Sequence, residues 1–350
     1  MKTAAKIALI LAAVLIVIGG LLFTGALAMA HWDFASLGNA KYETRTVEIG
    51  EAFRDILILS DTEDIALLPS EDGTCRVVFV EREGIGHTAA VQDGMLTIES
   101  VDTRSWYDWL TFGVGSLYGS GSPEITLWLP AAEYASLVIS EDTGDIDLPA
   151  DFRFGRIDIT AGTGDVRCAA SAAGPIRIRT DTGDIRLEGV SAEALELTVS
   201  TGRVEVRTVA CEGPAELHVS TGKAFLTDVS CASFVSDGNT GDLTLENVTA
   251  SGPVFIERST GDVRFVNSDA QELTVQTDTG SVTGSLLSPK VFVTKTDTGR
   301  VQVPETTSGG PCRITTDTGD IVIDIPGDAA GGNTRRASAR RQYAHMDYAI

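Results

Sequence analysis

Hydrophobic side chains recur at fixed distances on both sides of a repeated Thr-Gly pair. Aligned on the glycine, aliphatic residues stand seven and five positions before it and two and four positions after it. Ile185 and Leu187 follow one such glycine, and Leu195 and Leu197 precede the next. Because side chains alternate between the two faces of a strand, this spacing predicts two short strands per repeat, each with one buried face, joined by a turn at Thr-Gly.

The Thr-Gly pair occurs ten times at nearly even spacing. Successive glycines are 19 or 20 residues apart, at Gly144, Gly164, Gly183, Gly202, Gly222, Gly241, Gly261, Gly280, Gly299 and Gly319. One repeat buries too few aliphatic side chains to offset the conformational entropy of ordering about twenty residues, so the repeats must stack. We therefore expect an all-β, single-stranded parallel β-solenoid with 19–20 residues per coil, right-handed by the crossover rule.

An uncharged, mostly apolar run of twenty-four residues from Ile7 to Ala30 follows two lysines. Its length exceeds the roughly twenty residues that span a bilayer, and the basic flank predicts a cytoplasmic N-terminus. We expect residues 1–32 to be a membrane anchor with an N-terminal transmembrane helix. Ala28-Met29-Ala30 resembles a cleavage site, so a cleaved signal peptide is the alternative. Both interpretations place the rest of the chain outside the cytoplasm, at a bacterial cell membrane.

Residues 33–134 are less regular but hold one degenerate copy of the repeat. If Glu63 occupies the place of the glycine, Ile56 and Ile58 stand seven and five positions before it, and Ile65 and Leu67 two and four after it. A solenoid exposes strand edges at its ends, and such edges invite aggregation. We therefore expect this region to form an N-terminal cap that includes a degenerate first coil.

Further strands are expected inside the cap. Val77–Val80 and Ile125–Leu129 have strand composition, and Val91–Ile98 predicts a hairpin around Asp93-Gly94. Aromatic residues are concentrated between Arg104 and Tyr118, at Trp106, Tyr107, Trp109, Phe112 and Tyr118. They either pack the cap onto the first coils or form an exposed loop that contacts membrane, glycan or a partner protein.

The remaining boundaries follow from the repeats. Residues 135–326 are expected to form the solenoid coils, and residues 327–350 a disordered basic tail. The tail holds a cluster of basic residues, Arg335, Arg336, Arg340 and Arg341. It could bind anionic head groups or wall polymers, or fold back on the acidic surface of the protein, although a solvated tail is the simpler expectation.

The formal net charge is −22 and the isoelectric point is near 4.5. This balance argues against nucleic acid as a partner, because binding to phosphates needs clustered Lys and Arg. Six of the ten turn glycines are followed by aspartate. A column of carboxylates could bind calcium, but Arg203, Lys223, Ser281 and Arg300 interrupt it. We favour structural turns with charge relief and expect no metal site.

The five cysteines suggest no zinc site. Cys211 and Cys231 both follow their turn glycine by nine residues in adjacent coils, so they should stack within disulfide range. Cys75, Cys168 and Cys312 have no evident partner. We expect buried free thiols and leave a Cys211–Cys231 disulfide as the alternative.

No catalytic or cofactor-binding residues are expected. Asp278-Thr279-Gly280-Ser281 matches the aspartic protease motif in letters, but that chemistry needs two facing loops, whereas these copies repeat along a row. Polysaccharide-cleaving solenoids usually break the repeat with inserted loops, and no coil between Gly144 and Gly319 does so. His31, His87, His218 and His345 are scattered and suggest neither a base nor a ligand.

The tandem turns Thr180–Ile185 and Thr316–Ile321, preceded by an anchor and a cap, resemble the bacterial "toast-rack" or "putative adhesin" family of β-strand repeat proteins. The resemblance covers residues 45–326 and implies a cell-envelope protein with a domain of unknown function, related in some members to accessory components of envelope-stress response systems. It implies no catalytic residues.

Taken together, the sequence predicts a non-enzymatic, membrane-anchored β-solenoid outside the cytoplasm, a scaffold for adhesion or interaction or an accessory to envelope sensing. Its partners would be the membrane, through residues 7–30, and an envelope protein, a wall polymer or a host surface. The alternative is a module that binds or processes envelope glycans, in which Trp106 or Trp109 stacks on sugar beside carboxylates. A calcium-dependent module is a third hypothesis.

Overall fold

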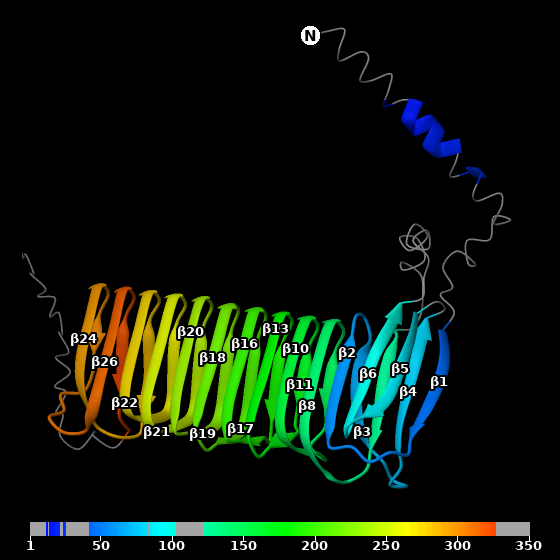
Figure 1. The fold of residues 1–350 in the computed structure, drawn as a ribbon. Coiled ribbons are helices and arrows are strands. Elements are labelled where there is room, and N and C mark those ends of the chain that lie inside the picture. The colour runs from blue at the N-terminus through cyan, green and yellow to red at the C-terminus, as the bar shows by residue number, and fades with distance from the viewer. Residues whose placement is uncertain are drawn as a thin grey trace, which may run out of the picture.

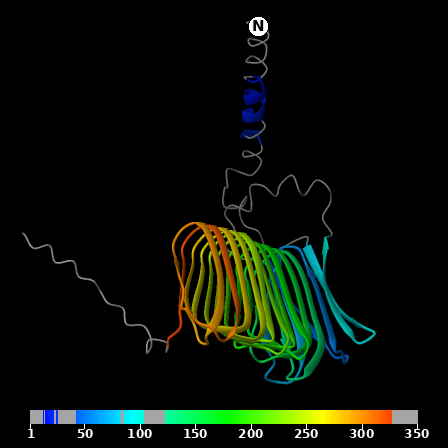
Figure 2. The ribbon, with the colours of Figure 1, turned by 90° about the vertical axis from the view of Figure 1, so that its left-hand side faces the viewer.

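The computed structural model describes residues 12, 14–21, 24, 25, 42–82, 85–102 and 122–326 of the chain. From Tyr42 onward these residues form 27 strands that belong to one hydrogen-bonded sheet. The sheet winds into an elongated solenoid whose coils stack side by side (Figure 1) around a shared interior (Figure 2). The predicted all-β, parallel β-solenoid is confirmed, whereas its handedness stays a prediction.

The N-terminal end contains seven strands. They are β1 (Tyr42–Ile49), β2 (Asp55–Ser60), β3 (Asp64–Pro69), β4 (Cys75–Arg82), β5 (Ile85–Gln92), β6 (Met95–Asp102) and β7 (Glu124–Leu129). The expected strands around Val77 and Ile125 are present as β4 and β7. The expected hairpin is β5–β6, with Asp93 and Gly94 at positive φ between the strands.

Each regular coil has a first strand that ends at the Thr-Gly turn and a second strand that follows it. The first strands are β8 (Glu133–Thr143), β10 (Arg153–Thr163), β13 (Pro175–Thr182), β16 (Ala194–Thr201), β18 (Pro214–Thr221), β20 (Ser233–Thr240), β24 (Lys290–Thr298) and β26 (Gly310–Thr318). The second strands are β9 (Ile146–Leu148), β11 (Val166–Cys168), β14 (Ile185–Glu188), β17 (Val204–Cys211), β19 (Ala224–Cys231), β23 (Val282–Leu286), β25 (Val301–Gln302) and β27 (Ile321–Asp324). The long strands β21 (Leu243–Thr260) and β22 (Val263–Thr279) join a second strand to the next first strand, and β12 (Ser171–Ala172) and β15 (Ser191–Ala192) are short third strands.

Equivalent positions of successive coils pair in parallel register. Ile157 pairs with Ile176, and Ile176 with Leu195. All three side chains point inward and are at most 4% exposed. The aliphatic positions predicted from the spacing therefore form continuous columns through the core, in which each side chain packs on its copies in the neighbouring coils.

Two features of the backbone require glycine at the Thr-Gly corner. Gly222 has a φ of +144°, a conformation that side chains disfavour. A Cβ atom on Gly222 would also lie 1.7 Å from the carbonyl oxygen of Gly202 in the preceding coil. The N–H of Gly222 donates to the carbonyl of Thr240 in the following coil at 2.8 Å. The repeat of glycine thus follows from close packing of the corners along the stack.

A second corner lies six residues after the turn glycine and was not predicted from the sequence. Its residues have φ between 49° and 69° and are Gly189, Thr208, Asp228, Asn247 and Asn267. Gly, Asn and Asp tolerate this left-handed conformation, which explains most of the column. The β-branched Thr208 is the exception and is held there by the corners on either side.

The coils near the N-terminus are not stacked in chain order. β2 pairs in parallel with both β6 and β8, and β3 with both β7 and β9, so the coil made by β6 and β7 lies outside the coil made by β2 and β3. The copy predicted around Glu63 is confirmed, because Ile56 pairs with Leu137 and Ile65 with Ile146. A Cβ on Gly144 would lie 2.3 Å from the Glu63 carbonyl oxygen, so Glu63 holds the place of a turn glycine.

The coils at the other end are also out of chain order. β22 pairs with β26, and β24 pairs with the other side of β26 (Figure 1). The coil of β26 and β27 therefore lies inside, and that of β24 and β25 forms the end. The inner coil has Cys312, Ile314, Ile321 and Ile323 in the core columns, where the outer coil has Phe292, Thr294, Val301 and Val303. Burial on both sides favours the more apolar set.

Residues 14–21 of the N-terminal segment are helical. Within the part of the chain that the structure describes, no helix has the length and apolar character needed to cross a membrane. Most of Ile7–Ala30 lies outside the described residues, so the transmembrane helix stays a prediction.

Candidate functional site

The aspartates that follow the turn glycines form a hydrogen-bonded ladder along the corner. Oδ1 of Asp145 accepts the backbone N–H of Asp165 at 2.8 Å, and Oδ1 of Asp165 accepts that of Asp184 at 2.9 Å. Oδ1 of Asp262 accepts the N–H of Ser281 at 2.7 Å in the same way. Each of these carboxylates binds the next coil, which is a structural reason for aspartate at this position.

Basic side chains relieve repulsion within this column. Arg186 lies 3.0 Å from a carboxylate oxygen of Asp165 and 2.7 Å from one of Asp184, and Lys223 lies 2.9 Å from Asp242. Burial opposes ionisation of Asp165, but the Asp184 N–H and the Arg186 guanidinium outweigh it and lower the pKa of the Asp165 carboxyl. No group of three or more His, Cys, Asp or Glu side chains in the described ranges is arranged to hold a metal ion.

A buried cluster of ionisable side chains lies where the N-terminal strands cover the first coils. The Ser60 hydroxyl donates to Glu63 Oε2 at 2.6 Å, and Glu63 Oε1 lies 3.4 Å from His87 Nε2. His87 Nδ1 lies 3.1 Å from Glu81 Oε1. Glu63, His87 and Glu141 are at most 4% exposed. The cluster joins β2, β4, β5 and β8, and the carboxylates of Glu63 and Glu81 lie beside the two ring nitrogens of His87.

The environment separates the pKa values within this cluster. Burial, with the neighbouring Glu63 and Asp142 charges, raises the pKa of Glu141 to about 8 against the hydrogen bond from the Thr143 N–H. Burial also opposes ionisation of Glu63, but the nearby His87 imidazole and hydrogen bonds from Ser60 and the Thr62 N–H lower its pKa to about 2. For His87, the Glu63 and Glu81 carboxylates overcome burial and raise the pKa. The Glu141 carboxyl therefore keeps its proton at neutral pH, and the cluster is buried beneath the cap, out of reach of a substrate.

His87 was not expected to be a functional residue because the histidines are scattered along the chain, and its partners Glu63 and Glu81 come from other segments. One feature of the sequence could have indicated the buried cluster. Glu63 stands where every other copy has glycine, at a corner that the stack buries. A carboxylate in such a place requires hydrogen-bond donors.

Arg258 is a second buried charge that was not predicted. The residue is 3% exposed, its Nη2 donates to the Ser236 hydroxyl at 2.7 Å, and its Nε has no partner among the described residues. Burial lowers the pKa of the guanidinium. A Cβ on Gly238 would lie 1.9 Å from Arg258 Nη1, so the missing side chain at Gly238 makes room for the arginine.

All five cysteines are buried free thiols, in agreement with the favoured interpretation. Cys211 and Cys231 lie in neighbouring strands, because Ala210 pairs with Ser230, and they do not form a disulfide. Burial raises the pKa of Cys168, Cys231 and Cys312 to about 12. Thiols with such pKa values are poor nucleophiles at neutral pH.

The other sequence-derived candidates divide into two groups. Asp278 lies in a row of equivalent positions, since its neighbours Thr277 and Thr279 pair with Thr316 and Thr318. The Asp-Thr-Gly copies therefore lie side by side along the stack and do not face each other. The aromatic segment Arg104–Tyr118 and the basic tail 327–350 lie outside the described residues, so their predicted contacts stay predictions.

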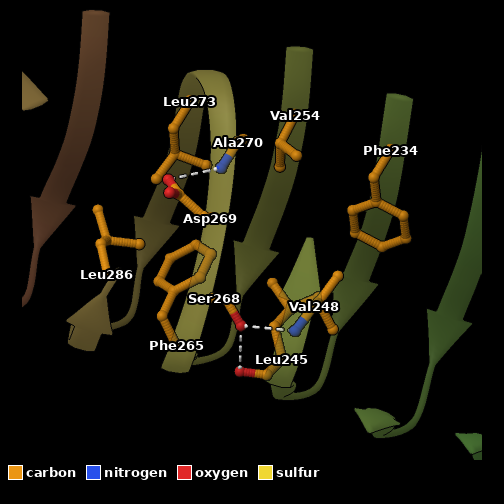
Figure 3. A pocket seen from close by; sticks show the side chains of 10 residues that line it. All are labelled: Phe234, Leu245, Val248, Val254, Phe265, Ser268, Asp269, Ala270, Leu273 and Leu286. Atoms are coloured by element: carbon orange, nitrogen blue, oxygen red, sulfur yellow. Dashed lines mark hydrogen bonds between the residues drawn. The ribbon is translucent and has the colours of Figure 1, made fainter. Parts of the chain in front are cut away.

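The interior near β21 and β22 contains a small cavity of about 10 Å³ (Figure 3). Phe234, Phe265 and Leu273 are among the side chains that line it. Ser268 and Asp269 are the polar side chains that line it, and both are already bonded: the Ser268 hydroxyl to the Val248 N–H and the Leu245 carbonyl, and the Asp269 carboxylate to the Ala270 N–H. A space of this size holds about one water, so it belongs to the packing of the core.

An open depression of about 760 Å³ lies on the surface at the corner near the end formed by β24. Small side chains such as Ala250 and Ala270 line it, together with Leu287 and Lys290. Lys290 is 2% exposed and lies 2.6 Å from a carboxylate oxygen of Asp269, so its charge is already compensated. The depression offers a shallow contact surface without a free charged group at its floor.

Stacked coils, corners bonded from one coil to the next and a capped N-terminal end define this chain as a parallel β-solenoid repeat protein. The chain belongs to the DUF4097 toastrack family, which matches residues 53–223 and 215–338. A comparison with curated proteins found no match.

Several solved structures are similar to this chain. A "putative adhesin" from Bacteroides fragilis is 13% identical, with 82% of this chain and 99% of that chain covered and a TM-score of 0.39. A "putative lipid binding protein" from Parabacteroides distasonis is 13% identical over 82% and 99%, with a TM-score of 0.46. A "putative adhesin" from Parabacteroides merdae is 12% identical over 82% and 98%, with a TM-score of 0.44.

Proposed function

We propose that this protein is a non-enzymatic, membrane-anchored scaffold outside the cytoplasm that serves adhesion or another interaction at the bacterial envelope. The observation that carries the proposal is the in-register stack of coils, which presents side chains in straight outward rows. Asp158, Arg177, Glu196 and Glu216 stand in one such row, and Arg177 lies 3.1 Å from Glu196. A rigid face with regularly spaced charges suits a polymer or a protein that binds along its length.

Anchoring completes the proposal. The apolar run Ile7–Ala30 holds the chain in the membrane, and the residues after His31 stand outside. The net charge of −22 keeps such a rod soluble and away from anionic surfaces. An accessory role in envelope-stress sensing is one form of this function, with a membrane sensor as the partner.

Protease treatment of intact cells tests the location. The full chain should be found in the membrane fraction and be digested from outside the cell. A variant that lacks residues 7–30 should stay inside and be protected. Protection of the full chain in intact cells would contradict the proposal.

Photo-crosslinking tests the interaction. A photoreactive side chain at Arg177, on the outward row, should capture a discrete envelope component on intact cells. The same side chain at the buried neighbour Ile178 is the matched control and should capture nothing. Equal capture from both positions, or capture from neither, would count against a binding role for this face.

A further inference from the structure

The two ends of the solenoid differ in how their last coil is covered. At the N-terminal end, the coil of β6 and β7 is covered because β5 pairs with β6 and β4 with β7, both antiparallel. Its inward side chains Leu96, Ile98 and Ile125 are fully buried. At the opposite end, among the described residues, β24 pairs only with β26 and β25 only with β27. One end is capped and the other, the open end (residues 287–309), has a free strand edge.

The open end exposes apolar side chains in two ways. Val301 stands in the core column beside Ile321, yet Val301 is 43% exposed and Ile321 is fully buried. Phe292, in the same end coil, is only partly buried. Val291 and Val293, on the outer face of β24, are 39% and 53% exposed. An apolar strand edge of this kind is a template for pairing with another strand.

We propose that the open end binds the open end of a second copy of this chain, with the two β24 strands paired antiparallel. The inference deepens the proposed function and rests on it, since it names one partner of the scaffold. The sequence of β24 complements itself when Phe292 of the two copies face each other. Val291 then faces Val293, and Lys290 faces Thr294, so apolar side chains meet and no like charges oppose each other.

The charge of the two ends favours a contact between two open ends over a contact between two capped ends. Residues 287–309 carry three basic side chains and two acidic ones, in a chain of net charge −22. Residues 42–102 at the capped end carry fourteen acidic side chains and four basic ones, so two capped ends would repel each other strongly. The capped end also covers its core residues Leu96, Ile98 and Ile125 with β4 and β5.

The symmetry of this contact limits it to two copies. Each copy has one open end, so pairing open ends closes the assembly as a two-fold dimer. The strand β1, which follows the predicted anchor in sequence, lies at the capped end (Figure 1). A pair joined by open ends therefore has its anchors at opposite ends, which suits a contact between two facing membranes.

Sedimentation velocity of the full chain in detergent tests the contact. We expect a dimer between about 1 and 100 µM. The double variant V291K/V293K should weaken it at least tenfold, because it places charge on the outer face of β24. F255K is the matched control: Phe255 stands in the same outward column as Val293 and is 39% exposed, but it lies on the internal strand β21. F255K should leave the dimer intact.

Two results would overturn the inference: a monomeric full chain at 100 µM, or equal loss of the dimer in F255K. A variant that ends at residue 326 tests whether residues 327–350 of the same chain bind the open end instead. If this variant dimerises and the full chain does not, residues 327–350 cover the open end and the second copy is excluded. Because these measurements do not depend on export, a dimer that stays inside cells would sink the proposed function alone, and an exported monomer would sink only the contact.

Discussion

Residues at the corners are selected by backbone conformation and by what the next coil leaves room for. At the Thr-Gly corner both conditions demand glycine, because a side chain on Gly222 would collide with the carbonyl of Gly202. At the second corner only the left-handed conformation matters, so Gly189, Asp228 and Asn247 all serve. The column accordingly varies in sequence, and its period is hidden from a search for one repeated letter.

Thr208 is the residue that fits its corner least well. We predict that Thr208→Asn stabilises the protein by about 0.5–1 kcal/mol, because asparagine adopts the left-handed conformation at lower cost than a β-branched residue. Asn247 shows the accompanying gain, since its side-chain amide donates to Asp228 at 2.8 Å. The melting temperature and amide exchange of residues 202–221 measure the effect.

Thr227→Asn provides the control for this prediction. Thr227 pairs with Arg207, one position before the corner, and does not have positive φ. The control should not stabilise the protein. A loss of stability in Thr208→Asn would show that the threonine contributes contacts that outweigh its strained backbone.

Apart from the β5–β6 hairpin, the strand pairings that the sequence predicted are those between equivalent strands of neighbouring coils. The columns of Ile157, Ile176 and Leu195 follow from spacing alone, because parallel strands of equal coils must align. The degenerate copy around Glu63 was found for the same reason. The cap pairs β1 with β4 and β4 with β7 in antiparallel fashion, and no repeat marks which strands meet. The contact between Glu63 and His87 depends on those pairings and could not be predicted.

The buried cluster makes the stability of the cap depend on pH. Glu141 has a folded pKa near 8 against an ordinary value of 4.5, so the folded cap keeps a proton that the unfolded chain releases between these values. Stability therefore falls as pH rises from about 5 to 8, by at most about 1.4 kcal/mol per pH unit. His87 adds to this trend, because its raised pKa contributes stability that is lost as pH rises through the folded value. Glu63 acts oppositely at low pH, where stability is lost as pH falls toward 2.

We predict that amide exchange in β5 and β6 is faster at pH 8 than at pH 5.5 after correction for the intrinsic rate. Glu141→Gln should remove most of this difference, because the amide does not ionise. Glu257→Gln, at an exposed position, is the control and should preserve the difference. An unchanged pH dependence in Glu141→Gln would show that another group controls the cap.

At the scale of the whole molecule, equal spacing does not reveal the order of the coils, and at the C-terminal end the inner coil has Ile314 and Ile321 where the outer coil has Thr294 and Val301. At both ends the coils do not stack in chain order. The coil of β6 and β7 lies outside the coil of β2 and β3, and the coil of β24 and β25 lies outside the coil of β26 and β27. In the proposed scaffold, the open end is therefore a coil that precedes the inner coil in sequence. Its attachment depends on residues that follow it in sequence.

A truncation after residue 309 tests this dependence. The variant lacks β26 and β27, which are the strands that pair with β24 and β25. We predict that residues 291–303 then lose order, because Thr294 and Val301 offer β22 a poorer core surface than Ile314 and Ile321 did. Limited trypsin digestion should cut rapidly at Lys295 and Arg300 in this variant and slowly in the full chain. A variant that ends at Leu286 removes both coils together and should leave β22 and β23 as resistant as before. If the chain ending at 309 stayed protected at Lys295, β24 could dock directly on β22, and apolar content would not be what sets the order of the coils.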